Sequence, residues 1–146
     1  MSEKQTAKEA IRILCCANIG FKELSASEKT KLSTVFARRN QVLYGKAFDL
    51  VNCKTEVDFL SEDIINSNLE SIKVYEIKST NRKNVPVDFA GYFFDLTTAE
   101  LLVAQSLGNQ YKFAFVNTVR GNYLEMTLQE LFARARKIYP KWAVLL

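Results

Sequence analysis

The stretch VYEIKSTNRK, residues 74–83, constrains the fold most, because it is an apolar run that ends in charged residues. Glu76 and Lys78 are two positions apart. In a β-strand such residues point to one face, while Tyr75 and Ile77 pack against the opposite face. Removing a charge from water costs several kcal/mol unless the charge is paired or bound to a metal. The stretch therefore predicts a half-buried strand that carries either an ion pair or a functional site.

A second short alternating run, EVDFL at residues 56–60, lies upstream. The two runs are separated by NSN, residues 66–68, which are typical turn residues. If strands near residues 56–62 and 72–78 form a hairpin around this turn, Asp58 lies opposite Glu76. Two carboxylates beside a lysine can hold a divalent cation and position a water molecule.

Asp63 is an alternative to Asp58, because it lies closer to Glu76 in the sequence. Pairing Asp63 with Glu76 would move the turn away from NSN, so we favour Asp58.

The residue types that the chain lacks restrict its chemistry. It has no histidine, and its three cysteines, Cys15, Cys16 and Cys53, do not have the spacing of a paired CxxC zinc site. The usual zinc ligand sets, the Ser-His-Asp triad and the Cys-His dyad are therefore excluded. Carboxylate, lysine and hydroxyl chemistry remains, and carboxylate oxygens suit Mg²⁺ or Mn²⁺.

Length and composition favour one domain over residues 1–146. The chain is 48% hydrophobic and contains no repeat or linker composition. Its net charge of +4 is compatible with a phosphate-bearing partner and is equally explained by solubility. No apolar run approaches the roughly 18 residues of a membrane span, and the N-terminus lacks the order of a signal peptide. We therefore expect a cytoplasmic protein with no membrane partner.

Helix starts are predicted where a hydroxyl residue precedes a glutamate by three positions. These pairs are Thr6 with Glu9, Ser25 with Glu28, Thr97 with Glu100, and Thr127 with Glu130. The first predicted helix ends at Gly20. The apolar stripe of the second continues to Val51, as one helix or as two broken near Gly45, so helices are expected over about residues 6–52 and the motif core over 55–118. Pro140 would end the last helix.

Further strands are predicted at residues 91–96, 111–118 and 123–126. The order strand, helix, strand over residues 91–118 suggests a crossover that returns beside the hairpin. The apolar tail, residues 141–146, is expected to form an edge strand or a partner surface, with Trp142 in a core or an interface.

The run EVDFL followed by VYEIKST resembles the motif of the PD-(D/E)XK nucleases, the restriction-endonuclease-like superfamily, over about residues 40–118. The resemblance implies an α/β fold, with a mixed central sheet, an acid-bearing hairpin and flanking helices. Asp58 matches the first acid, Glu76 the second and Lys78 the lysine, although Val57 stands where the motif has proline. Asp58, Glu76 and the backbone carbonyl of Ile77 would hold Mg²⁺ or Mn²⁺, and Lys78 would orient the attacking water.

The resemblance also implies a nucleic-acid partner, with DNA as the expected substrate. Ser79, Thr80, Arg82 and Lys83 would contact phosphates at the mouth of the site, joined by Arg38 and Arg39. Glu100 and Gln105 on the crossover helix are alternate site residues. The expected function is that of a metal-dependent endonuclease in restriction, defence, phage biology or junction resolution. Cleavage of both strands of a duplex would imply a homodimer. The alternatives are a non-catalytic nucleic-acid-binding domain and a protein-assembly domain.

Overall fold

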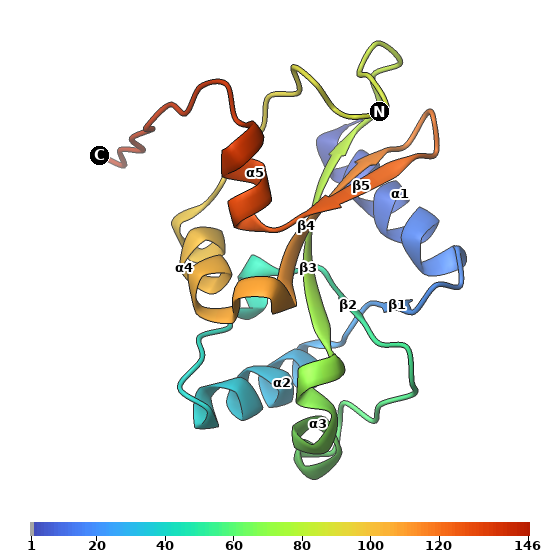
Figure 1. The fold of residues 1–146 in the computed structure, drawn as a ribbon, viewed down its shortest axis with the longest axis vertical. Helices are drawn as coiled ribbons and strands as arrows, with labels where there is room; N and C mark the ends of the chain where they lie inside the picture. The colour runs from blue at the N-terminus through green and yellow to red at the C-terminus, as the bar shows by residue number, and fades with distance from the viewer. Residues whose placement is uncertain (1) are drawn as a thin grey trace.

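The Glu-x-Lys stretch forms β3 (Lys73–Thr80), the middle strand of a five-stranded sheet in the computed structural model, which describes residues 2–146 (Figure 1). The strand order is β1-β2-β3-β4-β5. On one side β3 pairs antiparallel with β2 (Leu50–Asn52), and on the other it pairs parallel with β4 (Tyr111–Asn117). The edge strands are β1 (Phe21–Lys22) and β5 (Tyr123–Met126). The chain is therefore a mixed α/β protein with an open mixed sheet, which confirms the coarse fold class.

Helices cover both faces of this sheet. Helix α1 (Glu3–Cys16) lies on one face, and the opposite face is covered by α2 (Ala26–Arg38), α3 (Glu62–Asn68), α4 (Thr98–Leu107) and α5 (Leu128–Arg134) (Figure 1). Three short 3₁₀ turns complete the regular structure: η1 (Gly45–Ala47), η2 (Leu69–Ser71) and η3 (Gly108–Gln110).

The alternation along β3 assigns its side chains to these two faces. Tyr75 and Ile77 belong to the smaller core beneath α1, whereas Val74 belongs to the larger core beneath the other helices. Glu76 and Lys78 share the face of Val74, because they follow it at intervals of two residues. The strand prediction and the two-residue spacing are thus confirmed, and both charged side chains face the α4 side of the sheet.

The larger core is rich in aromatic residues from β4. Tyr111, Phe113 and Phe115 are almost completely buried. Burying one such side chain contributes about 1.5–3 kcal/mol. The strand predicted at residues 111–118 is confirmed. A crossover through α4 does lead to it, but the crossover begins at β3 and not at the strand predicted over residues 91–96.

Local capping signals predicted most helix starts. The boxes at Ser25 and Thr97 form as expected, and the Thr127 hydroxyl accepts a hydrogen bond from the Glu130 N–H. Helix α1 begins earlier than predicted, because Ser2 and Gln5 form a capping box one turn ahead of Thr6.

The hairpin predicted over residues 56–62 and 72–78 is wrong. Residues 56–60 form a loop, and the segment that was expected to turn is helix α3. The Ser61 hydroxyl caps α3 by accepting the N–H of Ile64, and Glu62 and Asp63 stabilise its first turn because acidic groups favour a helix N-terminus. The strand that pairs antiparallel with β3 is β2 instead.

The helix predicted to continue to Val51 is also wrong. Helix α2 ends at Arg38, and Asn40 then adopts a left-handed conformation with φ of 59°, a common way to end a helix. The chain continues through η1 into β2. The region over residues 6–52 therefore contributes strands β1 and β2 of the sheet as well as helices.

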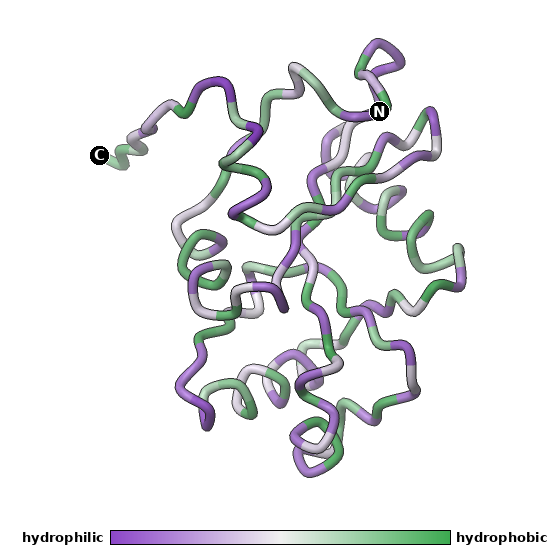
Figure 2. Tube along the Cα trace, viewed as in Figure 1, coloured by the Kyte–Doolittle hydropathy of each residue, from purple (hydrophilic) through white to green (hydrophobic). Residues whose placement is uncertain are grey.

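The remaining differences lie near the C-terminus. Residues 91–96 form a loop rather than a strand, and α5 ends at Arg134, before Pro140. The tail that follows extends away from the sheet and ends in exposed apolar residues, which Figure 2 shows in green; Trp142 is exposed rather than buried in a core. Within residues 2–146 no helix has the length and apolar character needed to cross a bilayer.

Candidate functional site

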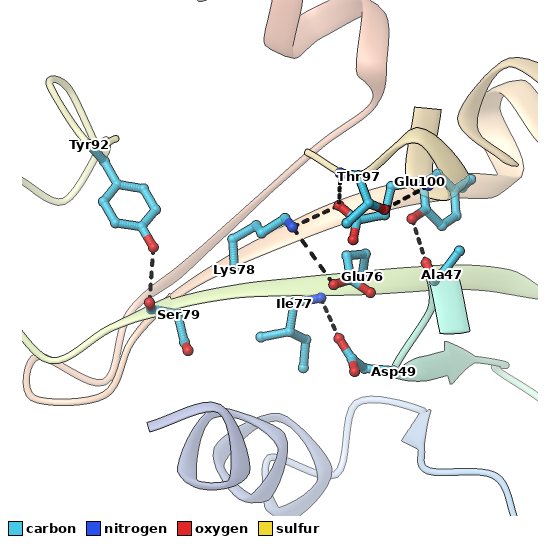
Figure 3. Close-up of polar contacts among 10 residues, drawn as sticks. Ala47, Asp49, Glu76, Ile77, Lys78, Ser79, Tyr92, Thr97 and Glu100 are labelled. Carbon is cyan, nitrogen blue, oxygen red and sulfur yellow. Dashed lines mark hydrogen bonds and ion pairs between the residues drawn. The ribbon is translucent and has the colours of Figure 1, made fainter. Parts of the chain in front are cut away.

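Asp49, at the entry to β2, faces Glu76 on β3. The regular pairing of the two strands ends at Leu50 and Tyr75, and the carboxylate of Asp49 lies close enough to that of Glu76 for its negative charge to raise the Glu76 pKa. The backbone N–H of Asp49 donates to the carbonyl of Tyr75 at 2.8 Å, and its carboxylate Oδ2 accepts the N–H of Ile77 at 2.9 Å (Figure 3). Two carboxylates therefore meet on adjacent strands, which is the arrangement that the sequence predicted with a different first acid.

Lys78 lies beside Glu76 and forms ion pairs with two glutamates. Its Nζ lies 3.8 Å from Glu76 Oε1 and 2.7 Å from Oε1 of Glu100, which comes from the first turn of α4 (Figure 3). The side chains of Lys78 and Glu76 are 13% exposed, and that of Glu100 is 5% exposed. Glu100 also accepts the N–H of Thr97, so the glutamate that completes the capping box of α4 is the one that holds the lysine.

The electrostatics of Glu76 follow from this crowding. Burial, together with the negative charges of Asp49 and Glu100, raises the pKa of Glu76 to about 9 against the opposing effect of Lys78. A carboxyl group with such a pKa holds a proton at neutral pH unless a cation stabilises its charge. Strongly shifted groups of this kind often mark functional sites.

A buried tyrosine on β4, close to the carboxylates of the site, fixes the loop before β2. Tyr111 donates its hydroxyl hydrogen to the carbonyl of Ala47 at 2.6 Å. Burial raises the pKa of Tyr111, as do the nearby carboxylates, so the hydroxyl remains a donor. On the other side of this loop, Lys29 Nζ donates to the carbonyls of Gly45 and Phe48 at 3.1 and 2.8 Å. Asp49 is thereby held in place from both sides.

The structure does not bring the two predicted first acids to Glu76. Asp58 lies in the exposed loop before α3, where its carboxylate accepts the N–H of Leu60, and Asp63 lies in the first turn of α3. The charged groups that act on Glu76 are Asp49, Glu100 and Lys78. The expected pairing of Asp58 with Glu76 is wrong because the strand that would have carried Asp58 does not form.

The predicted phosphate-contact residues divide into two sets. Ser79, Thr80 and Arg82 line a cavity of about 700 Å³ at the end of β3, together with Lys78. Lys83 is the next residue in the same exposed loop.

Arg38 and Arg39 lie elsewhere, at the end of α2 against α3. Arg38 pairs with Glu62 at 2.8 Å, and Arg39 donates to the carbonyl of Asn66 at 3.0 Å. On α4, Glu100 belongs to the site, whereas Gln105 is exposed.

A divalent cation such as Mg²⁺ needs oxygen ligands from the protein. Within residues 2–146 no group of three or more Asp, Glu, Cys or His side chains has the arrangement of a metal site. Mg²⁺, however, is usually held by one or two carboxylates, with water and substrate phosphate completing its shell. Asp49 and Glu76 satisfy this smaller requirement. The N–H and C=O of a strand residue point to the same side, so the Ile77 carbonyl also faces Asp49.

Comparisons with known proteins add no assignment. No protein-family model matches the chain, and neither the curated proteins nor the solved structures gave a significant match. The features that bear on function are therefore the positions of Asp49, Glu76, Lys78 and Glu100.

Proposed function

We propose that this chain is a metal-dependent endonuclease of the PD-(D/E)XK superfamily, with Asp49 as the first acid. The proposal is supported by one observation above all: the Asp49 carboxylate, just before β2, accepts the N–H of Ile77 and lies beside Glu76 on β3, with Lys78 two residues further along the same strand. The order of the sheet, with β2 antiparallel to β3 and β4 parallel to it after a crossover helix, agrees with the restriction-endonuclease-like fold.

Phosphodiester hydrolysis requires help at two points. The negative phosphate repels a nucleophile, and the ester oxygen is a poor leaving group. Mg²⁺ or Mn²⁺ held by Asp49 and Glu76 would supply Lewis-acid polarisation of the phosphate and favour ionised water. The carboxylates are suited to this role because their charges repel each other in a buried place, so a cation between them relieves an unfavourable interaction.

Lys78 has two tasks in the proposed reaction. Its ammonium group orients the attacking water and stabilises the negative charge that develops on the phosphate oxygens. Water adds to phosphorus and gives up a proton to solvent, one P–O ester bond breaks, and the leaving oxygen takes a proton from solvent. Glu100 acts as a positioning residue, because it holds Nζ of Lys78 at 2.7 Å and so limits the rotamers of a long side chain.

The test is cleavage of supercoiled plasmid, linear duplex, branched and single-stranded DNA with Mg²⁺ and with Mn²⁺. We expect Asp49→Asn, Glu76→Gln and Lys78→Met each to lower the rate by about a hundredfold or more. Asp58→Asn is the matched control, because Asp58 is an exposed acid in the loop next to β2, and it should cleave as the wild type does.

Two results would contradict the proposal. One is a folded wild-type protein that cleaves none of these substrates with either metal. The other is loss of cleavage in Asp58→Asn together with normal cleavage in Asp49→Asn. The first result would favour a buried Lys78–Glu100 ion pair with a purely structural role, in a binding or assembly domain.

A further inference from the structure

The cavity at the end of β3 has one polar wall and one aromatic wall. The polar wall consists of residues 78–82 and Asn84, and the aromatic wall is the loop Ala90–Asp95. A volume of about 700 Å³ lies within the range of small-ligand pockets, which is roughly 300–1,000 Å³. Lys78 belongs to the polar wall, so the cavity opens directly beside the proposed reaction centre.

The aromatic wall is held in place by alternate residues. Tyr92 donates its hydroxyl hydrogen to the carbonyl of Ser79 at 2.9 Å (Figure 3). Its ring also stacks on Phe94, with 5.6 Å between the ring centroids. Phe94 in turn packs edge-on against the buried Phe115 at 4.9 Å. The residue between them, Phe93, has 73% of its surface exposed. Two anchored rings thus present the third ring to solvent at the cavity.

A second exposed ring lies next to Phe93. Tyr139, which is 63% exposed, has its ring centroid 6.4 Å from that of Phe93. Exposed aromatic rings beside a basic groove are the usual means of binding single-stranded nucleic acid.

The polar wall provides cationic groups and a fixed backbone. Asn117 Nδ2 donates to the carbonyl of Arg82 at 2.9 Å, and the Arg120 guanidinium donates to the carbonyl of Lys83 at 2.7 Å. The side chains of Arg82 and Lys83 have no ion pair with any residue in the described part of the chain. Two acids also line the cavity: Asp95 is paired with Lys141 at 2.9 Å, and Glu3 lies in the first turn of α1.

We infer that the site takes a single-stranded polynucleotide, with a base adjacent to the scissile phosphate stacked on Phe93 and the backbone passing Arg82. This inference rests on the proposed nuclease function, because Lys78 is shared by the reaction centre and the cavity. A base can stack on Phe93 only if its face is free, and in a duplex both faces are covered by neighbouring pairs. A single strand also needs only one copy of the chain, so no dimer is required.

The experiment measures binding by fluorescence anisotropy of labelled DNA and RNA oligonucleotides, each single-stranded and as a duplex of the same sequence. Ca²⁺ is present in place of Mg²⁺, and a gel confirms that each oligonucleotide stays intact. We expect a single strand to bind at least about tenfold more tightly than its duplex. Phe93→Ala should weaken single-strand binding by about fivefold to a hundredfold, which is the range for loss of one stacking contact.

Two further variants make the result specific. Phe93→Tyr should bind as the wild type does, because it keeps an aromatic face. Phe132→Ala removes another exposed phenylalanine, on α5 and outside the cavity, and should leave binding unchanged. Preference for DNA or for RNA among the single strands identifies the sugar and supports the inference in either case.

Duplex binding equal to or tighter than single-strand binding would overturn the inference, as would equal effects of Phe93→Ala and Phe132→Ala or no binding at all. Failure of the proposed function looks different. Single-strand binding that depends on Phe93, with no cleavage in Mg²⁺ or Mn²⁺, would refute the nuclease and retain the binding site. Cleavage that prefers a duplex would refute only the single-strand inference.

Discussion

The carboxylate of Asp49 accepts the backbone N–H of Ile77 at 2.9 Å. This bond extends the β2–β3 pairing by means of a side chain, and it orients Asp49 toward the strand that carries Glu76. The position of the carboxylate is therefore set by the sheet itself.

The first prediction separates the hydrogen bond of Asp49 from its charge. Asp49→Ala leaves the N–H of Ile77 without its acceptor and should lower the free energy of unfolding by about 1–3 kcal/mol. Asp49→Asn keeps an oxygen acceptor and should lose less. Urea denaturation of the two variants measures the difference. Equal losses would show that the hydrogen bond contributes nothing.

The second prediction concerns the pH dependence of stability. The pKa of Glu76 is about 9 in the folded protein and about 4.5 as its ordinary value. Between these values the folded protein holds a proton that the unfolded chain has released, so the free energy of unfolding contributed by Glu76 falls as pH rises through this window. The contribution is complete below pH 4.5 and lost above pH 9.

Glu76→Gln removes this titration, so the variant should lose less stability than the wild type between about pH 5 and pH 9. Denaturation of both proteins across this range checks the prediction. Parallel pH profiles would contradict the raised pKa of Glu76.

The third prediction links metal binding to proton release. A cation bound at Asp49 and Glu76 needs the charged form of Glu76, and at neutral pH that group is protonated. Titration calorimetry of Mn²⁺ binding in two buffers of different ionisation enthalpy should show release of up to about one proton. Binding without proton release would mean that Glu76 is not a ligand, and Asp58→Asn serves as the control variant.

The fourth prediction addresses the Lys78–Glu100 pair. Both side chains are largely buried, so Glu100→Gln should lower the free energy of unfolding by about 3–5 kcal/mol. It should also lower the pKa of Glu76, because Glu100 is one of the negative charges that raise it. Carboxyl NMR titration measures this second effect. Glu9→Gln, in an exposed pair with Arg12, should cause no measurable change.

The fifth prediction concerns the buried Asn117, which ties β4 to the polar wall of the cavity. It donates to the carbonyl of Arg82 and accepts the N–H groups of Val119 and Arg120. Asn117→Ala should cost about 1–3 kcal/mol of stability and weaken single-strand binding. Asn109→Ala, at an exposed position, is the matched control. Unchanged binding in Asn117→Ala would show that the loop after β3, which contains Arg82, does not contribute to the binding site.

The sequence predicted the parts of the site that have local signals. Glu76 and Lys78 share a face because the alternation over residues 74–78 is clear, and Glu100 begins a helix because Thr97 caps it. Asp49 had no such signal. It precedes a strand of only three residues, Leu50–Asn52, which is too short to show a period of two, and the apolar residues around it also fit a helical stripe.

The false hairpin arose for a related reason. EVDFL alternates as a strand would, yet strand pairing is decided by partners that are distant in the sequence. The segment after it carries its own helix signals in Ser61, Glu62 and Asp63. Once that segment is helical, the acid opposite Glu76 has to come from before the loop, and Asp49 is the acid immediately before β2.

Strand β3 is hydrogen-bonded on both sides, to β2 and to β4. Amide groups in such a position exchange with solvent only when most of the molecule opens. Glu76 and Lys78 are thus attached to the last segment to open, and Asp49 is bonded directly to it. On heating, the arrangement of these side chains should persist up to the global melting transition and disappear with it, without an earlier local step.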